Sequence, residues 1–147
     1  MAIELNPPFA AAYCGFGDSL AYEGRYDEAM DKFDKAIELS PNDPQRWAFL
    51  TYGSLALIFK QDFVAALAWA KKASEVPNCQ YWTIAHTAVA LAYLDRPDEA
   101  RRSVENLLSE NPAFTTAYAK EKLFYLQRPV HCQLYSEGLE MAGVPAA

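Results

Sequence analysis

The sequence predicts an all-α fold, a right-handed superhelix of stacked antiparallel helical hairpins with capping helices at the C-terminal end. Three observations support this prediction. The segment over residues 2–7 recurs as residues 36–41, apolar residues are spaced three and four apart, and Gly or Pro lies between the apolar segments. A short repeat period indicates units that bury their apolar faces against one another. The apolar spacing is that of amphipathic helices.

Length and composition favour one folded, soluble domain. The chain has 147 residues, of which 52% are hydrophobic and 22% are charged, so it can form a core of its own. The net charge of −6 argues against a nucleic-acid or anionic-membrane surface, which requires clustered Lys and Arg. No apolar run is long enough to span a membrane, and no secretion signal opens the sequence.

The repeat is clearest near the start of the chain. Residues 2–7 and 36–41 agree at five of six positions. Between them, helical spacing places Tyr13, Phe16 and Leu20 on one face of a first helix, and Gly24 is expected to end that helix. Two small residues, Gly17 and Ala29, allow the two helices of the hairpin to approach closely, and Phe33, Ala36 and Pro41 complete the pattern.

This pattern resembles the tetratricopeptide repeat, and two looser copies follow. In the second, a long helix from about 44 to 60 carries Trp47 and Leu50 and absorbs three extra residues, and Phe63, Ala66, Ala70 and Ala73 mark the next helix. In the third, Pro97 begins the second helix. It follows Phe63 by one full repeat length, the same distance in sequence that separates Ala2 from Ala36. The expected units are the tail of a truncated upstream repeat over 1–8, repeats over 9–41, 42–78 and 79–112, and capping helices over 113–147.

The capping region is expected to hold a helix over about 114–125 and a final helix over about 130–142 that ends at Gly143. A cap is needed because the last apolar face of a helical stack must be covered. Residues 2–7 match only the end of a repeat's second helix, so we expect Met1 to be an added initiator and the natural protein to continue upstream.

The C-terminal pattern, Arg128-Pro129 followed by Leu134, Leu139 and Gly143-Val144-Pro145, resembles the repeat regions of bacterial signalling proteins. These are regions that follow class III adenylate or guanylate cyclase domains or winged-helix transcriptional regulators. The resemblance implies that any catalytic or DNA-binding domain lies upstream, and that this chain senses, docks or oligomerises in the cytoplasm as part of signal transduction.

The resemblance also implies a partner-binding groove lined by the first helix of each hairpin. Helical spacing nominates Cys14, Asp18, Ala21 and Tyr22, then Thr51, Leu55, Ile58 and Phe59, then Trp82, Ala85, Val89 and Tyr93. Only Asp18 is charged, so this lining suits an apolar or amphipathic protein segment. Some tetratricopeptide domains grip a terminal carboxylate with Lys, Asn and Arg, and Cys14 and Asp18 in the matching places disfavour that activity here.

Two alternatives stay open for the groove. The chain's own C-terminal helix could fill it, with Leu134, Leu139 and Met141 packing inward, or a second copy of the chain could cover it. We therefore weigh two functions, binding of a protein or peptide partner and self-association that regulates an upstream domain.

Catalysis, cofactors and metals are not expected. The two histidines, His86 and His131, belong to no catalytic motif, and His86 is expected to be a packing or surface residue. The adjacent His131 and Cys132 make a poor chelate on a helix, and the three cysteines contain no CxxC pair. Of the tryptophans, Trp47, Trp69 and Trp82, the last is the best candidate for a binding anchor.

Overall fold

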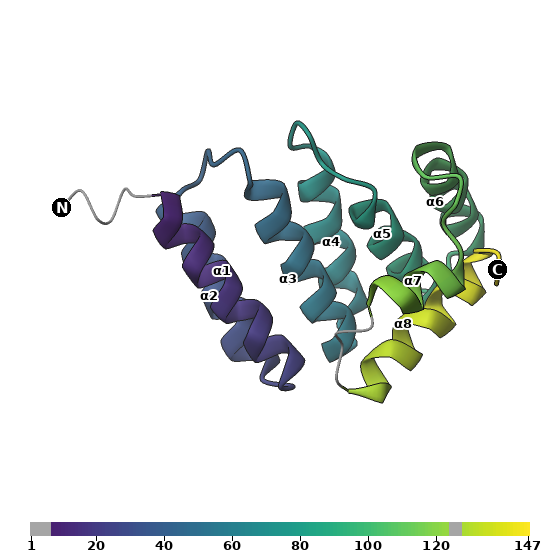
Figure 1. The fold of residues 1–147 in the computed structure, drawn as a ribbon, viewed down its shortest axis with the longest axis horizontal. Coiled ribbons are helices and arrows are strands. Elements are labelled where there is room, and N and C mark those ends of the chain that lie inside the picture. Colours follow the sequence, from purple (N-terminus) through teal and green to yellow (C-terminus); the bar gives the residue numbers. More distant parts are fainter. Residues whose placement is uncertain (1–6, 124–127) are drawn as a thin grey trace.

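The computed structural model describes residues 7–123 and 128–147, and these residues form a stack of helices without strands. Consecutive antiparallel pairs lie side by side along the molecule, and the last two helices lie across the front of the third pair (Figure 1). The helices are α1 (Pro7–Tyr22), α2 (Tyr26–Leu39), α3 (Arg46–Lys60), α4 (Phe63–Ser74), α5 (Trp82–Tyr93), α6 (Pro97–Glu110), α7 (Thr116–Lys122) and α8 (Pro129–Ala142). The all-α superhelical arrangement predicted from the sequence is confirmed.

The first hairpin depends on two glycines that the sequence singled out. A Cβ at Gly17 would lie 3.0 Å from the carbonyl oxygen of Ala29 and 3.0 Å from the Phe33 ring, so α1 and α2 touch at this position. Gly24 has a φ of 85°, in the left-handed region where a side chain is disfavoured. The chain therefore reverses in a short turn between α1 and α2.

The second hairpin is joined by a tighter link. Helix α3 continues to Lys60, where the three extra residues were expected to lie. The Asp62 side chain accepts a hydrogen bond from the amide of Ala65 and so caps the start of α4. The helices meet closely here as well, because the Trp69 ring of α4 lies against Gly53 of α3.

The C-terminal region differs in detail from the prediction. The helix expected over 114–125 is only the short α7, which starts at Thr116 because the Thr115 hydroxyl accepts the amide of Tyr118 at its first turn. The predicted end of that helix lies outside the described residues. The amides of Thr116 and Ala117 donate to the carbonyls of Pro145 and Ala146, so the C-terminal tail completes the first turn of α7.

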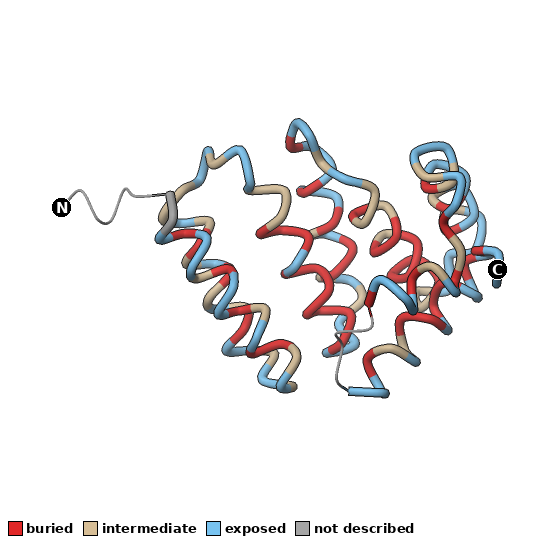
Figure 2. The backbone as a smooth tube through the Cα atoms, in the orientation of Figure 1, coloured by how far each residue is buried: buried red, intermediate tan, exposed pale blue. Residues whose placement is uncertain are grey.

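The core runs through the middle of the stack. Buried residues are concentrated in α3 and α5 and recur along α8, whereas α1 and α2 are exposed over more of their length (Figure 2). The largest cluster joins residues from α3, α4, α5, α6 and α8, including Ile58, Val89, Leu107, Tyr135 and Leu139. Helix α8 is therefore part of the core.

The tail of an upstream repeat expected over 1–8 falls largely outside the described residues, and Pro7 and Pro8 already belong to α1. Among the described residues, no helix is both long enough and apolar enough to cross a membrane.

Two glycine substitutions test the helix packing. A Cβ at Gly53 would lie 2.4 Å from the Trp69 ring, whereas a Cβ at Gly15 would meet nothing within 4 Å. We expect Gly53→Ala to lower the free energy of unfolding by about 1–3 kcal/mol through overpacking. Gly15→Ala should raise it by about 0.5–1 kcal/mol, because alanine is the better helix former. Urea unfolding of both variants measures this, and equal effects would contradict the α3–α4 contact.

Candidate functional site

The twelve residues nominated for the groove do not form an open surface. Eight of them are buried and four are half-buried, and none is exposed. The buried ones are Cys14, Ala21, Thr51, Leu55, Ile58, Phe59, Ala85 and Val89, and the half-buried ones are Asp18, Tyr22, Trp82 and Tyr93. The concave side of the stack is thus largely covered, and the cover consists of other parts of the same chain.

At one end of α8, His131 reaches back to the first two hairpins. Its imidazole stacks on the Phe59 ring of α3, with the ring centres 3.9 Å apart and the planes 4° apart. Its Nε2 atom lies 2.8 Å from the Tyr26 hydroxyl of α2. Its Nδ1 atom is buried and has no hydrogen-bond partner among the described residues. Helix α8 therefore contacts both α2 and α3 through one side chain.

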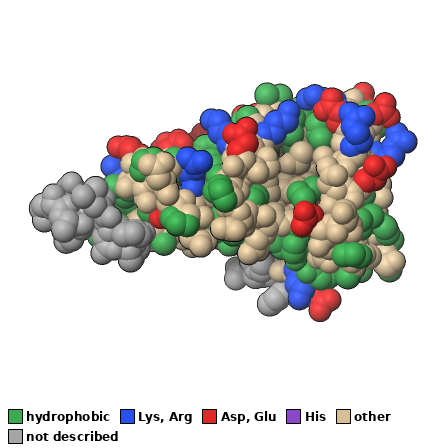
Figure 3. All heavy atoms as spheres, turned by 90° about the horizontal axis from the view of Figure 1, so that it is seen from above, with side chains coloured by type: hydrophobic (Ala, Val, Ile, Leu, Met, Phe, Trp, Pro, Cys, Tyr) green, Lys and Arg blue, Asp and Glu red, His purple; other side chains and the backbone are tan. Residues whose placement is uncertain are grey.

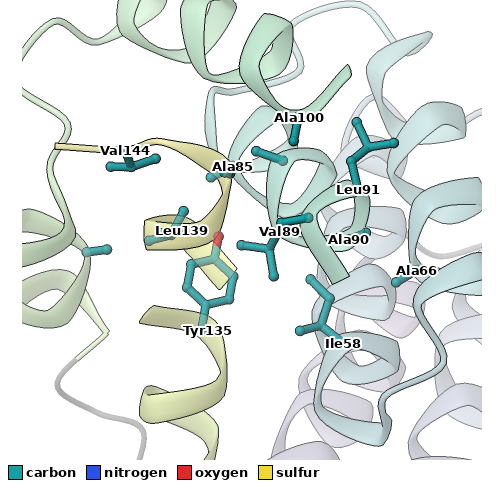
Figure 4. Close-up of a cluster of buried hydrophobic side chains, with 14 of the residues drawn as sticks. Ile58, Ala66, Ala85, Val89, Ala90, Leu91, Ala100, Tyr135, Leu139 and Val144 are labelled. Carbon is teal, nitrogen blue, oxygen red and sulfur yellow. The ribbon is translucent and has the colours of Figure 1, made fainter. Parts of the chain in front are cut away.

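Further along, α8 lies directly on α5. The Tyr135 hydroxyl lies 2.8 Å from Nδ1 of His86, and both side chains are buried. The Tyr93 hydroxyl donates to the carbonyl of Leu134 at 2.5 Å. Tyr135 and Leu139 point toward Val89 of α5 (Figure 4). A Cβ at Gly138 would lie 2.7 Å from Val89, so the two helices could not approach as they do with any other residue there.

The expectation that α8 packs inward through Leu134, Leu139 and Met141 needs correction at one residue. Leu139 is fully buried and Leu134 is half-buried, but Met141 is exposed. The inward face of α8 contains Tyr135, Gly138 and His131 beside Leu139, and it does not contain Met141. Apolarity alone did not reveal this face, because two of its residues carry polar groups and one has no side chain.

One part of the concave side remains hollow. Between α3, the start of α5 and the end of α7 lies a pocket of about 310 Å³. It contains three of the predicted groove residues, Thr51, Leu55 and Trp82. The other lining residues are Trp47, Ala48, Tyr52, Gln80, His86, Lys122 and Leu123. The walls are mostly aromatic and aliphatic, which is typical of sites that accept an apolar side chain.

The polar groups near this pocket are largely engaged with one another. The Thr51 hydroxyl donates to the carbonyl of Trp47 at 2.6 Å and lies 2.7 Å from the Thr83 hydroxyl. The thiol of Cys79 donates to the same Thr83 hydroxyl at 3.0 Å. Among the described lining residues Lys122 carries a positive charge, and its ammonium lies 5.5 Å from the centre of the Tyr118 ring. The pocket thus has an apolar interior and a cationic rim.

Asp18 and Cys14 form the charged part of the predicted groove on α1. Burial raises the pKa of the Asp18 carboxyl to about 6, and its hydrogen bond with Tyr22 acts in the opposite direction. Burial and then the Asp18 charge raise the pKa of the Cys14 thiol to about 12, so this thiol is neutral and unreactive. Neither residue lines the pocket between α3, α5 and α7.

The titratable residues that the structure describes do not converge on one another in a catalytic arrangement. His86 is a packing residue, and burial lowers its pKa to about 3, so it stays neutral at physiological pH. Burial and then Arg128 lower the pKa of His131. In the part of the chain that the structure describes, no group of three His, Cys, Asp or Glu residues could hold a metal ion.

On the face drawn in Figure 3, Lys and Arg side chains are interspersed with Asp and Glu.

Sequence reasoning missed most of the pocket lining. Tyr52, Gln80 and Lys122 were not nominated, because the groove was deduced from one helix face at a time. The position of α7 decides which parts of α3 and α5 remain uncovered. The sequence of this short helix did not indicate how it would sit against its neighbours. Trp47 and Trp82, noted in the sequence as possible anchors, are both in the lining.

Comparison with known proteins agrees with this geometry. Residues 10–43 match the sequence model of the tetratricopeptide repeat, and the stacked hairpins are the fold of that class of helical repeat domain. The fold is similar to that of the first TPR domain of the human RPAP3 protein, solved by NMR. The TM-score is 0.69 at 20% sequence identity, over 92% of this chain and 98% of that domain. This likeness concerns the fold. A search of curated proteins gives no significant match to the sequence.

The α5–α8 contact predicts a pH dependence of stability. His86 has an ordinary pKa of 6.5 when unfolded and about 3 when folded, so the unfolded chain binds more protons below pH 6.5. Its contribution is therefore present above pH 6.5 and is lost as the pH falls. Between pH 7.5 and 5.0 the wild type should lose about 2 kcal/mol relative to His86→Gln.

Urea unfolding of the two proteins at both pH values measures this difference. Taking the difference removes the contributions of His131 and Asp18, which titrate in both proteins. A gap between wild type and variant that does not change with pH would show that His86 is not buried as a neutral group.

Proposed function

We propose that this chain is a non-catalytic protein-binding module, and that the pocket between α3, α5 and α7 receives an apolar side chain of a partner segment. The observation that carries the proposal is the pocket itself. Among the described residues it is a hollow part of the concave side that α8 does not fill, and two tryptophans, a tyrosine and two leucines line it. Aromatic residues in concave sites are the usual anchors of protein recognition.

The size and shape of the pocket favour a side chain of an extended or helical segment over a whole folded surface. About 310 Å³ lies at the low end of the range for small-ligand sites, and it fits one bulky aliphatic or aromatic group. Tyr52 is 40% exposed at its edge, so it can contact the partner backbone on either side of the inserted group. Helix α8 restricts the segment to this end of the groove, because it covers Phe59 and Val89.

The partner is therefore an apolar or amphipathic protein segment, as the sequence predicted, but it engages fewer of the predicted residues. Thr51, Leu55 and Trp82 remain in the proposed site. Phe59, Val89 and Tyr93 contact α8, so we assign them to the core of the domain. Ala85, Cys14, Asp18 and Tyr22 do not line the pocket.

A peptide selection tests this proposal. Random peptides displayed on phage are selected against the wild-type chain, and the recovered peptides are synthesised and their affinity is measured by fluorescence titration. We expect peptides with a bulky apolar residue that bind Tyr52→Ser at least tenfold more weakly than wild type. The matched control is Val64→Ser, which changes another exposed apolar residue on α4. Peptides that bind all three proteins equally, or no recovered peptides, would contradict the proposal.

Self-association is the second candidate function, in the setting of a cytoplasmic regulatory region of a bacterial cyclase or winged-helix regulator. It is supported by exposed apolar residues on α1, where Phe9 is 42% and Phe16 is 54% exposed. The setting itself rests on the C-terminal sequence pattern.

The two functions predict different masses in solution. If the pocket binds foreign segments, light scattering should give the monomer mass of 16.4 kDa at all micromolar concentrations. A dimer at low micromolar concentration that Phe16→Ser dissociates would instead make self-association the leading function.

A further inference from the structure

The imidazole of His86 has one nitrogen that the helical core uses and one that it does not. Its Nδ1 atom lies 2.8 Å from the Tyr135 hydroxyl of α8. Its Nε2 atom makes no hydrogen bond with the residues that the structure describes. The side chain is only 3% exposed, and it lines the pocket between α3, α5 and α7. The open space beside this ring is therefore the pocket, where an occupant can reach Nε2.

The two nitrogens of this ring have opposite hydrogen-bonding roles. Burial lowers the pKa of His86 to about 3, so the imidazole is neutral and has one N–H donor and one acceptor nitrogen. If the Tyr135 hydroxyl donates to Nδ1, then Nε2 carries the proton, and if Nδ1 donates, then Nε2 accepts. A group that both donates and accepts hydrogen bonds satisfies Nε2 in either case.

The other polar groups at the base of the pocket already have partners. The Thr51 hydroxyl donates to the carbonyl of Trp47, so it accepts the proton of the Thr83 hydroxyl, 2.7 Å away. The Thr83 hydroxyl in turn accepts the thiol proton of Cys79 at 3.0 Å. Each of these three protons thus has an acceptor within the chain. On the rim, Lys122 is exposed, so water can solvate its ammonium when the pocket is filled.

A wholly apolar occupant would leave Nε2 of His86 without a partner. It would exclude water from this atom, and a buried polar atom that lacks a hydrogen bond lowers the affinity. An aromatic ring with a hydroxyl at its tip fills the same space and supplies the missing bond. A volume of about 310 Å³ accommodates such a ring, and the aromatic side chains of Trp47 and Trp82 are available to pack against it.

We propose that the pocket recognises a tyrosine side chain of the partner segment, with the phenol ring between Trp47 and Trp82 and its hydroxyl bonded to Nε2 of His86. This inference rests on the proposed function of the pocket and specifies the anchor residue. A phenol hydroxyl both donates and accepts, so it matches either tautomer of the histidine. Phenylalanine or leucine fills the same space but leaves Nε2 unpaired. His86 thus determines specificity through Nε2, while its Nδ1 bond to Tyr135 fixes the ring.

Two small probes that differ by one hydroxyl test this proposal. p-Cresol carries the phenol group of a tyrosine side chain, and toluene carries the ring of phenylalanine. Each is titrated into the whole chain, and the indole N–H signals are followed by proton–nitrogen correlation NMR. Trp47 and Trp82 line the pocket, whereas Trp69 does not and is the internal control. We expect shifts at the two pocket tryptophans, and about tenfold tighter binding of p-cresol than of toluene.

Two variants localise the preference. His86→Asn keeps a hydrogen-bonding atom near the place of Nδ1, where it can still meet Tyr135, and has no atom in the place of Nε2. We expect this variant to bind the two probes with nearly equal affinity. The matched control is Lys122→Met, which removes the charge on the rim and should keep the tenfold preference. Circular dichroism shows whether both variants are folded.

The outcomes separate this inference from the proposed function. Equal affinity of the two probes for the wild type would overturn the tyrosine assignment and leave an apolar pocket. The same holds for a p-cresol preference that folded His86→Asn retains or that Lys122→Met abolishes. If neither probe shifts the signals of Trp47 and Trp82, both the inference and the proposed function are wrong.

Discussion

The contact between α5 and α8 determines which parts of the concave side belong to the core and which part stays hollow. It depends on close approach at Gly138 and on a buried hydrogen bond between His86 and Tyr135. Each polar atom of that pair satisfies the other, so two polar side chains can be buried without the large cost of an unpaired group. With α8 held there, Val89 is buried and Tyr93 is half-buried, and a pocket between α3, α5 and α7 stays hollow.

The two ends of the stack differ in how far their apolar faces are covered. At the C-terminal end, α8 and the tail over residues 144–146 cover the last hairpin, and the tail also supplies carbonyl acceptors to the first turn of α7. At the N-terminal end, α1 exposes the same kind of apolar face that its repeat copy on α3 buries.

The proposed function depends on this covering. A groove open along its whole length could bind a long helix or an extended tail, but α8 leaves an aromatic pocket with a lysine among its lining residues. We therefore propose recognition of one anchor residue rather than of a long segment. His86 lines this pocket, and burial lowers its pKa to about 3. Burial and then Arg128 lower the pKa of His131, which lies at the other contact of α8, against Phe59.

The sequence by itself determined the helices of the three hairpins, their pairing and their order, but not the extent of α7. Spacing along one helix and the placement of Gly17, Gly24 and Pro97 are local features, and local features fix hairpins. Tertiary structure alone decided that α8 crosses the concave side through Tyr135, Gly138 and His131, and that Met141 faces solvent. The reason is physical: how two helices dock depends on which small residue permits close approach and which buried polar groups find partners, and both depend on residues distant in sequence.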